Sequence, residues 1–507
     1  MESLKELFFN YILYNPQKPL LFTQAFFWIF FLFVLFIYSL IYRRIALRNG
    51  YLFLVSLYFY YKCGGVYIWL LVASIIVTYF IGLGVYKCRQ KWIKKFYVAL
   101  SVIVSITLLA YYKYTYFFID IWNSLFHSHI KAQDYLAFLT NQGFNTHFDI
   151  SVIILPVGIS FFSFQALSYT IDLYRGKTRP VRNIIDFGFY KSFFPQLVAG
   201  PIVRAAEFIP QIYTRYTLNN REMSHALFLI LNGLIKKMVI SDYISINFVD
   251  RVFDNPLNYS GFENLISVYG YSLQIYCDFS GYTDIAIGLA LLLGFRIPIN
   301  FNSPYKANNL TDFWHRWHIS LSSWLRDYLY IPLGGNRKGK FRTYVNLLTT
   351  MLLGGLWHGA HLRFFIWGGL HGIGLVIEKW WLTIFPSPHK YGYRNLITQL
   401  ITFQFVSFAW IFFRAANMQT VGEMLNQIGN HFGARLIPAM VVSYAPIFSI
   451  ISVGFLVHWL PDRFKEKYRG WFIKSPVYAK ILVFILAILV IIQFKSSMIQ
   501  PFIYFQF

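Results

Sequence analysis

Long apolar runs separated by short basic clusters dominate the chain. Many of the runs reach or approach the roughly 20 residues that a helix needs to cross a bilayer. They occupy residues 21–42, 51–61 with 66–86, 96–119, 150–171, 226–246, 265–295, 345–357, 364–381, 396–413, 445–460 and 481–494. The pattern predicts an all-α, multi-pass membrane protein with about eleven transmembrane helices.

Residues 300–342 do not follow this pattern. They mix tryptophan, tyrosine, histidine, arginine and aspartate. Pro304 lies near the start of the region, and Pro332 and the pair Gly334-Gly335 lie near its end. Irregular backbone is tolerated at membrane depth only where it is buried in protein or lines a wet cavity. We therefore expect short interfacial or re-entrant helices here.

Composition supports a membrane protein. Hydrophobic residues make up 57% of the chain and charged residues only 13%, about half the charged share of an ordinary soluble domain. The net charge of +24 would suggest nucleic acid binding on a soluble protein. Here the basic residues flank apolar runs, which the positive-inside rule and anionic lipid headgroups explain, so no nucleic acid partner is expected.

The chain shows no sign of division into domains. Neither a repeat period nor a linker is evident, so residues 1–507 are interpreted as a single membrane domain. Three scattered cysteines form no disulfide framework. The first apolar run lacks a small-residue cleavage site, and we expect a retained helix there and not a signal peptide.

Two histidine motifs are the candidate chemistry: DFWHRWHIS at residues 312–320 and GGLWHGA at residues 354–360. His358 ends an apolar run between glycines, which allow close backbone approach and would leave room for a flexible substrate chain. A histidine with a pKa near 6.5 can accept and return a proton as a general base. A packed core histidine is the structural alternative.

His318 has a similar pair of interpretations. It is either a hydrogen-bonded interfacial histidine or a polar group that faces an internal cavity. Asp312 and Arg316 are close enough in sequence to orient its ring or hold its charge.

Other chemistries have weaker support. His315 with His318, and His358 with His361, are i, i+3 pairs that would share a helix face. No HExxH motif or ligating carboxylate spacing accompanies them, and no metal site is predicted. GxSxG, P-loop and dinucleotide motifs are missing from the sequence. Asp278 and Asp284 lie in an apolar run, where they would either carry protons in a transporter or tie helices together; we favour the tie.

The run WHRWHISLSSWLRDYLYIPLGGNR at residues 314–337 resembles the signature of the membrane-bound O-acyltransferase family. It is most similar to the bacterial branch that holds alginate O-acetyltransferases and teichoic acid D-alanyl transferases. Further matches lie in order at residues 155–162, 194–202, 274–284, 355–360 and 408–414. The motif-bearing core therefore covers about residues 150–415.

The resemblance implies a ring of helices around a central funnel, with His358 at the position of the invariant family histidine and His318 at that of the second. It further implies walls or supporting contacts from a set of neighbouring residues: Asp312, Arg316, Trp314, Trp317, Trp357 and Asn336. His315 and the His361-Leu362-Arg363 run depart from the branch pattern, and no role is assigned to His315 or His361.

The implied activity is transfer of an acyl group to a hydroxyl of a cell-surface or exported polysaccharide, and acetyl is the group expected. The donor would be a cytoplasmic thioester, acetyl-coenzyme A or an acylated carrier protein, with no bound cofactor. A periplasmic or surface partner of the SGNH esterase-like type would complete the transfer at the bacterial inner membrane. The alternative is a multi-pass transporter that uses the same histidines and aspartates as a relay, although no inverted repeat is evident.

Overall fold

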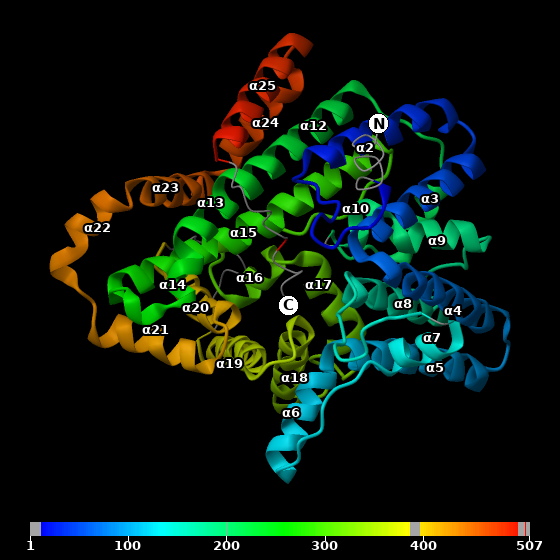
Figure 1. Cartoon of the computed structure of the whole chain (residues 1–507), viewed down its shortest axis with the longest axis horizontal. Coiled ribbons are helices and arrows are strands. Elements are labelled where there is room, and N and C mark those ends of the chain that lie inside the picture. Colours follow the sequence, from blue (N-terminus) through cyan, green and yellow to red (C-terminus); the bar gives the residue numbers. More distant parts are fainter. Residues whose placement is uncertain (1–11, 145, 199, 386–395, 495–501, 503–507) are drawn as a thin grey trace.

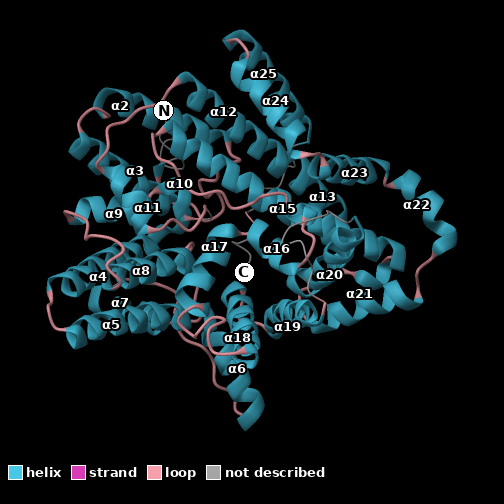
Figure 2. Ribbon diagram, turned by 180° about the vertical axis from the view of Figure 1, so that it is seen from behind, coloured by secondary structure: helices cyan, strands magenta, loops and turns pink. Residues whose placement is uncertain are grey.

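The computed structural model describes residues 12–144, 146–198, 200–385, 396–494 and 502. Every regular element in these ranges is a helix, which confirms the all-α prediction (Figure 2). Among the described residues, most buried hydrophobic side chains form one large cluster that extends from Leu20 to Phe502, and a second, smaller cluster contains Leu321 and Trp357.

The first part of the chain forms helices joined by tight helical turns. A 3-10 turn, η1 (Gly65–Tyr67), joins α3 to α4, and a π turn, η2 (Ala110–Tyr114), joins α5 to α6. The helices are α2 (Ala25–Ile41), α3 (Ile45–Gly64), α4 (Ile68–Lys87), α5 (Lys91–Leu109), α6 (Thr115–Phe126), α7 (Tyr135–Phe144), α8 (Ile159–Tyr174), α9 (Ile184–Ser192), α10 (Phe194–Leu197) and α11 (Ala205–Ile212).

Two long helical stretches run side by side through the middle of the molecule in both views (Figures 1 and 2). One comprises α12 (Asn220–Leu234), η3 (Ile235–Ser241), α13 (Asp242–Ile244), η4 (Ser245–Val249) and α14 (Asp250–Asp254), and the other is α15 (Gly261–Leu292). Each begins with a capping box, Asn219 with Glu222 and Ser260 with Glu263, which satisfies backbone N–H groups at the helix start.

The aspartates of α15 tie these two stretches together. Asp284 accepts from Lys236 at 2.8 Å, and Asp278 forms an ion pair with Lys237, whose ammonium also lies 2.8 Å from Asp242. Because both aspartates are paired with lysines of η3, the helix-tie interpretation accounts for them.

The irregular region contains the expected short helices. They are η6 (Pro304–Lys306), α16 (Leu310–Arg316), α17 (Ile319–Leu325) and η7 (Arg326–Tyr330). Phe313, Trp317 and Leu321 are buried, and α16 and α17 lie near the middle of both views (Figures 1 and 2). One face of the short helices is thus packed into the protein.

The remaining helices pack around this centre, and α21, α22 and α25 reach the periphery (Figure 1). They are α18 (Lys340–His358), α19 (Leu362–Ile384), α20 (Leu396–Arg414), α21 (Met418–Asn430), η8 (Ala434–Leu436), α22 (Ile437–Ser443), α23 (Ala445–Trp459), α24 (Asp462–Lys474) and α25 (Val477–Phe494).

Fewer helices qualify as membrane spans by length and composition than the hydropathy pattern predicted. Six stretches qualify among the described residues: Ile45–Lys87, Lys91–Phe126, Asn220–Asp254, Gly261–Leu292, Leu396–Arg414 and Val477–Phe494. A seventh would be the pair Ala434–Ser443 and Ala445–Trp459, bent by 89°. The chain is a multi-pass membrane protein, whereas the count of about eleven spans and the central funnel stay predictions.

Helix length accounts for part of the difference. Two predicted spans became helices of 17 and 16 residues, α2 and α8, which are shorter than the roughly 20 residues of a typical crossing. Most side chains of α8 are buried in protein, so its apolar sequence serves the core of the molecule.

Candidate functional site

His358 is the last residue of α18, and its side chain is buried. Its ring lies edge-on to three aromatic rings: Trp357 at 4.9 Å, Trp367 of α19 at 5.2 Å and Phe413 of α20 at 5.2 Å between centroids. Three helices therefore converge on this histidine and enclose it in aromatic surface.

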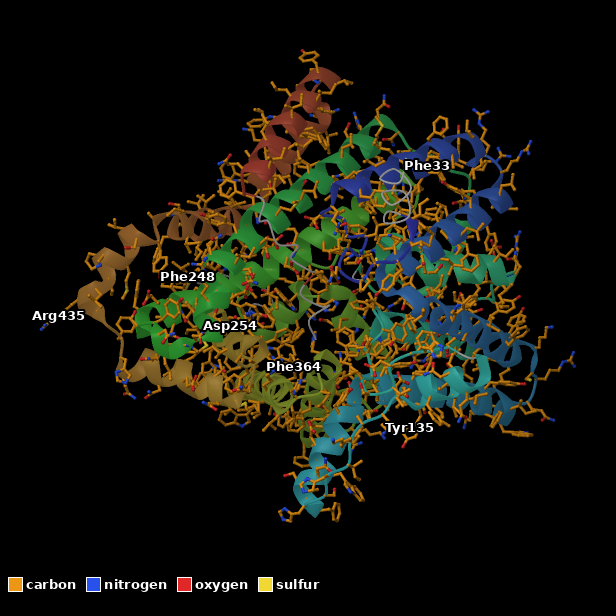
Figure 3. All side chains as sticks on the ribbon, viewed as in Figure 1. Phe33, Tyr135, Phe248, Asp254, Phe364 and Arg435 are labelled. Atoms are coloured by element: carbon orange, nitrogen blue, oxygen red, sulfur yellow. The ribbon has the colours of Figure 1, made fainter. Side chains whose placement is uncertain are left out.

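The glycines beside His358 serve helix packing. A Cβ on Gly355 would overlap the carbonyl oxygen of Phe364 and lie 3.1 Å from Cα of Gly368, and one on Gly359 would overlap the Phe364 ring. Phe364 lies well inside the outline of the molecule (Figure 3). The close backbone approach predicted for these glycines is confirmed at Gly355, and α19 fills the space that a Cβ would occupy at Gly355 and Gly359. Room for a substrate chain beside His358 stays a prediction.

His318 precedes α17 with a left-handed backbone (φ 44°, ψ 54°) and is fully buried. Residues with a Cβ seldom adopt this conformation, which costs on the order of 1–3 kcal/mol. Asn300 holds the turn: its carbonyl oxygen accepts from the Ile319 N–H at 3.0 Å, and its Oδ1 accepts from the Ser320 N–H at 3.0 Å. The strain at His318 is thus maintained by defined contacts.

Trp357 contacts both histidines. Its ring centroid is 4.9 Å from that of His358 and 6.2 Å from that of His318, and Phe279 of α15 covers His318 at 4.6 Å. The fold therefore brings together the two histidines that the sequence singled out. Burial lowers the pKa of His318 to about 3, so its imidazole is neutral at pH 7.

Asp312 and Arg316 form an ion pair of 2.7 Å on α16. Asp312 also accepts from the Asn308 N–H at 3.2 Å, and Arg316 donates to the Asn302 carbonyl oxygen at 3.3 Å. These contacts anchor the segment that carries Asn300. The Asp312–Arg316 pair therefore supports the His318 turn indirectly, through the backbone segment of Asn300 and Asn302. That the pair orients the His318 ring directly stays a prediction.

The tryptophans of the first motif belong to the same aromatic cluster. The Trp314 ring is 5.8 Å from Trp367, and the Trp317 ring is 5.0 Å from Trp410, which in turn stacks on Trp367 at 5.7 Å. Because Trp367 also packs on His358, Trp314 and Trp317 belong to the aromatic cluster beside that histidine, and their role as walls of the site stays a prediction.

Three other residues lie on the surface. Asn336 is exposed in the turn before α18, His315 is exposed on α16, and His361 is exposed at the start of α19. The supporting role predicted for Asn336 stays a prediction, and His315 and His361 keep no assigned role.

Sequence reasoning missed two polar residues near the site. His371 of α19 is fully buried, with its ring 5.0 Å from Trp367 and 5.2 Å from Trp314. Lys113 of η2 reaches the backbone of His358. Both lie inside apolar runs, where ionisable residues are costly, and that cost was the available signal.

Within the described residues, no group of three or more histidine, cysteine, aspartate or glutamate side chains is arranged to hold a metal ion. The site offers imidazole nitrogens inside aromatic walls, which can move a proton or donate a hydrogen bond to developing negative charge. That chemistry suits acyl transfer to a hydroxyl.

Comparison with known proteins identifies the class. The chain belongs to the membrane-bound O-acyltransferase family, whose model matches residues 94–419. This confirms the resemblance seen in the motifs, and the chain is accordingly an O-acyltransferase.

Its relatives act, by name, on peptidoglycan, alginate or teichoic acid. A peptidoglycan O-acetyltransferase of Helicobacter pylori is 38% identical over 400 residues, covering 74% of this chain and 72% of the relative. A probable alginate O-acetylase of Pseudomonas syringae is 40% identical over 386 residues, covering 74% and 69%. A teichoic acid D-alanyltransferase of Bacillus subtilis is 30% identical over 281 residues, covering 51% and 68%.

Proposed function

We propose that this protein is an O-acetyltransferase of the bacterial inner membrane. It moves an acetyl group from a cytoplasmic thioester to a hydroxyl of an exported or cell-surface polysaccharide. The observation that carries the proposal is the burial of His318 and His358 within one aromatic cluster, where both rings contact Trp357. The two best-covered relatives described above, both O-acetyltransferases by name, support acetyl as the group transferred.

In the proposed reaction, a ring nitrogen of His358 takes the proton of the acceptor hydroxyl as its oxygen attacks the thioester carbonyl carbon. The new C–O bond forms, and negative charge develops on the carbonyl oxygen. The neutral His318 imidazole donates its N–H to that oxygen. The C–S bond then breaks, and the leaving thiolate takes up the proton held by His358.

The aromatic walls have a defined part in this reaction. Trp314, Trp317 and Trp357 exclude water from the two histidines, which limits hydrolysis of the thioester and strengthens the electrostatic interactions inside the site. Asp312 and Arg316 hold the segment that fixes the His318 turn.

The donor is acetyl-coenzyme A or an acetylated carrier protein, and the final acceptor is reached through an extracytoplasmic SGNH esterase-like partner. In this scheme the first hydroxyl acylated belongs to the partner, which passes the acetyl group on to the polysaccharide. The enzyme then needs no soluble carrier that crosses the membrane, and it supplies proximity between donor and acceptor.

Reconstituted protein tests the proposal. Proteoliposomes are supplied with acetyl-labelled coenzyme A or, separately, with labelled acetyl carrier protein, and transfer to added polysaccharide is measured with and without the partner. We expect His358→Ala to abolish transfer and His315→Ala, an exposed histidine of the neighbouring motif, to retain it. Full transfer by correctly folded His358→Ala would exclude His358 from the mechanism.

A further inference from the structure

The end of α18 that carries His358 is held by side chains from a distant helix. The last carbonyl groups of a helix have no donor within it. Here the Lys113 ammonium donates to the carbonyl oxygens of Trp357 at 2.6 Å and His358 at 3.0 Å. The Tyr114 hydroxyl donates to the carbonyl oxygen of Leu356 at 2.8 Å. Three consecutive carbonyls are therefore satisfied from one short segment.

The local structure of that segment makes the contact possible. Lys113 and Tyr114 belong to the π turn η2, which interrupts the helical stretch Lys91–Phe126. Neighbouring residues on a regular helix point about 100° apart, and a π turn alters that spacing. Such turns often occur at functional sites. The ammonium also lies 5.9 Å from the centroid of the Trp357 ring.

Ending α18 with the Lys113 ammonium costs more free energy than an ordinary helix cap would. A glycine or a polar turn would end α18 without placing a lysine in an apolar membrane stretch. A cation at a helix C-terminus is favoured by the helix dipole. The two hydrogen bonds of Lys113 also fix the peptide groups on both sides of the His358 Cα atom. These peptide groups set the direction of the Cα–Cβ bond of His358.

We propose that Lys113, assisted by Tyr114, is a positioning residue that fixes the last turn of α18 and thereby aims the His358 side chain. The effect on catalysis rests on the proposed function, since it assumes that His358 must meet the acceptor hydroxyl in one geometry. Displacement of a catalytic group by about 1 Å can cost on the order of 100-fold in rate.

The structure offers a matched control for the loss of a lysine that donates to the backbone of another helix. Lys191 of α9 is buried and donates to two groups of α4, the carbonyl oxygen of Ser74 at 2.8 Å and Thr78 Oγ1 at 2.9 Å. Lys191→Met removes a comparable set of hydrogen bonds without touching α18.

The kinetic test compares Lys113→Met, Lys113→Arg, Tyr114→Phe and Lys191→Met in proteoliposomes with labelled acetyl-coenzyme A. For Lys113→Met we expect kcat to fall roughly tenfold to a hundredfold with KM for the donor unchanged. Lys113→Arg keeps the donors and should recover most of kcat, and Tyr114→Phe should show a smaller loss. Lys191→Met should keep kcat per folded molecule. Wild-type kcat in Lys113→Met, or an equal loss in Lys191→Met, would overturn the proposal.

A second measurement does not depend on catalysis. Diethylpyrocarbonate modifies accessible imidazoles, and the rate at the His358 peptide can be followed by mass spectrometry. We expect slow modification in the wild type and in Lys191→Met, and several-fold faster modification in Lys113→Met. A wild-type rate in Lys113→Met would overturn the positioning role. Absence of acetyl transfer by the wild type would instead refute the proposed function and leave this comparison valid.

Discussion

Gly355 provides a direct test of how α18 and α19 meet. The change is Gly355→Ala, which adds one methyl group three residues before His358. That methyl would lie far under 3.0 Å from the Phe364 carbonyl oxygen, closer than real Cβ atoms come to other atoms, and 3.1 Å from Cα of Gly368. Both obstacles are backbone atoms, so neither can rotate away.

Gly354→Ala is the matched control, because the added Cβ would lie 3.3 Å from Cδ1 of Leu325, the flexible end of a side chain. Both substitutions replace glycine by alanine within a helix, which by helix propensity stabilises the folded state by about 1 kcal/mol. This contribution to the unfolding free energy cancels when the two variants are compared. What remains is the overpacking cost at Gly355. Overpacking typically costs about 1–3 kcal/mol, so we expect Gly355→Ala to be less stable than Gly354→Ala by that amount.

The assay is equilibrium unfolding of the purified proteins in mixed micelles, followed by tryptophan fluorescence as the denaturing detergent is increased. Acetyl transfer is measured on the same preparations, and Gly355→Ala should be the weaker enzyme because α18 carries His358. Equal stability of the two variants would refute the backbone contact between α18 and α19.

Three further predictions concern buried polar groups. Asp278→Leu leaves Lys237 paired with Asp242 and should cost about 1–3 kcal/mol of unfolding free energy; an unchanged unfolding free energy would contradict the tie. Asn300→Ala removes the acceptor for the Ser320 N–H and should cost about 1 kcal/mol and lower acetyl transfer; unchanged kinetics would show that the His318 turn holds without it. Since burial keeps the pKa of His318 near 3 and an unfolded histidine titrates near 6.5, protons favour the unfolded state below about pH 6.5. Wild type should therefore lose about 2 kcal/mol more than His318→Gln between pH 7 and pH 5, and equal losses would contradict a neutral buried imidazole.

The all-helical class, and the choice of His318 and His358 as the candidate site residues, could be predicted because each depends on local sequence. Lipid offers no hydrogen bonds, so an apolar run of sufficient length must form a helix. The motifs of residues 312–320 and 354–360 place His318 and His358 in a recognisable order, and the family match covers both.

The number of spans was less predictable for a physical reason. An apolar side chain is equally stable against lipid and against another helix, so hydropathy alone does not separate the two environments. The run at residues 150–171 was predicted as a span, yet most of α8 is buried within the protein. The glycines around His358 show the same limit, since only the position of α19 reveals what fills the space beside them.

The sequence by itself determined that this is a helical membrane protein of the O-acyltransferase family with two histidines in its motifs. Only the tertiary structure decided that both histidines contact Trp357, that Asn300 maintains the strained turn at His318, and that Lys113 holds the backbone of His358. The last contact joins residues 245 positions apart. Local patterns carry no information on such a pair, because the contact forms only when the intervening helices have packed.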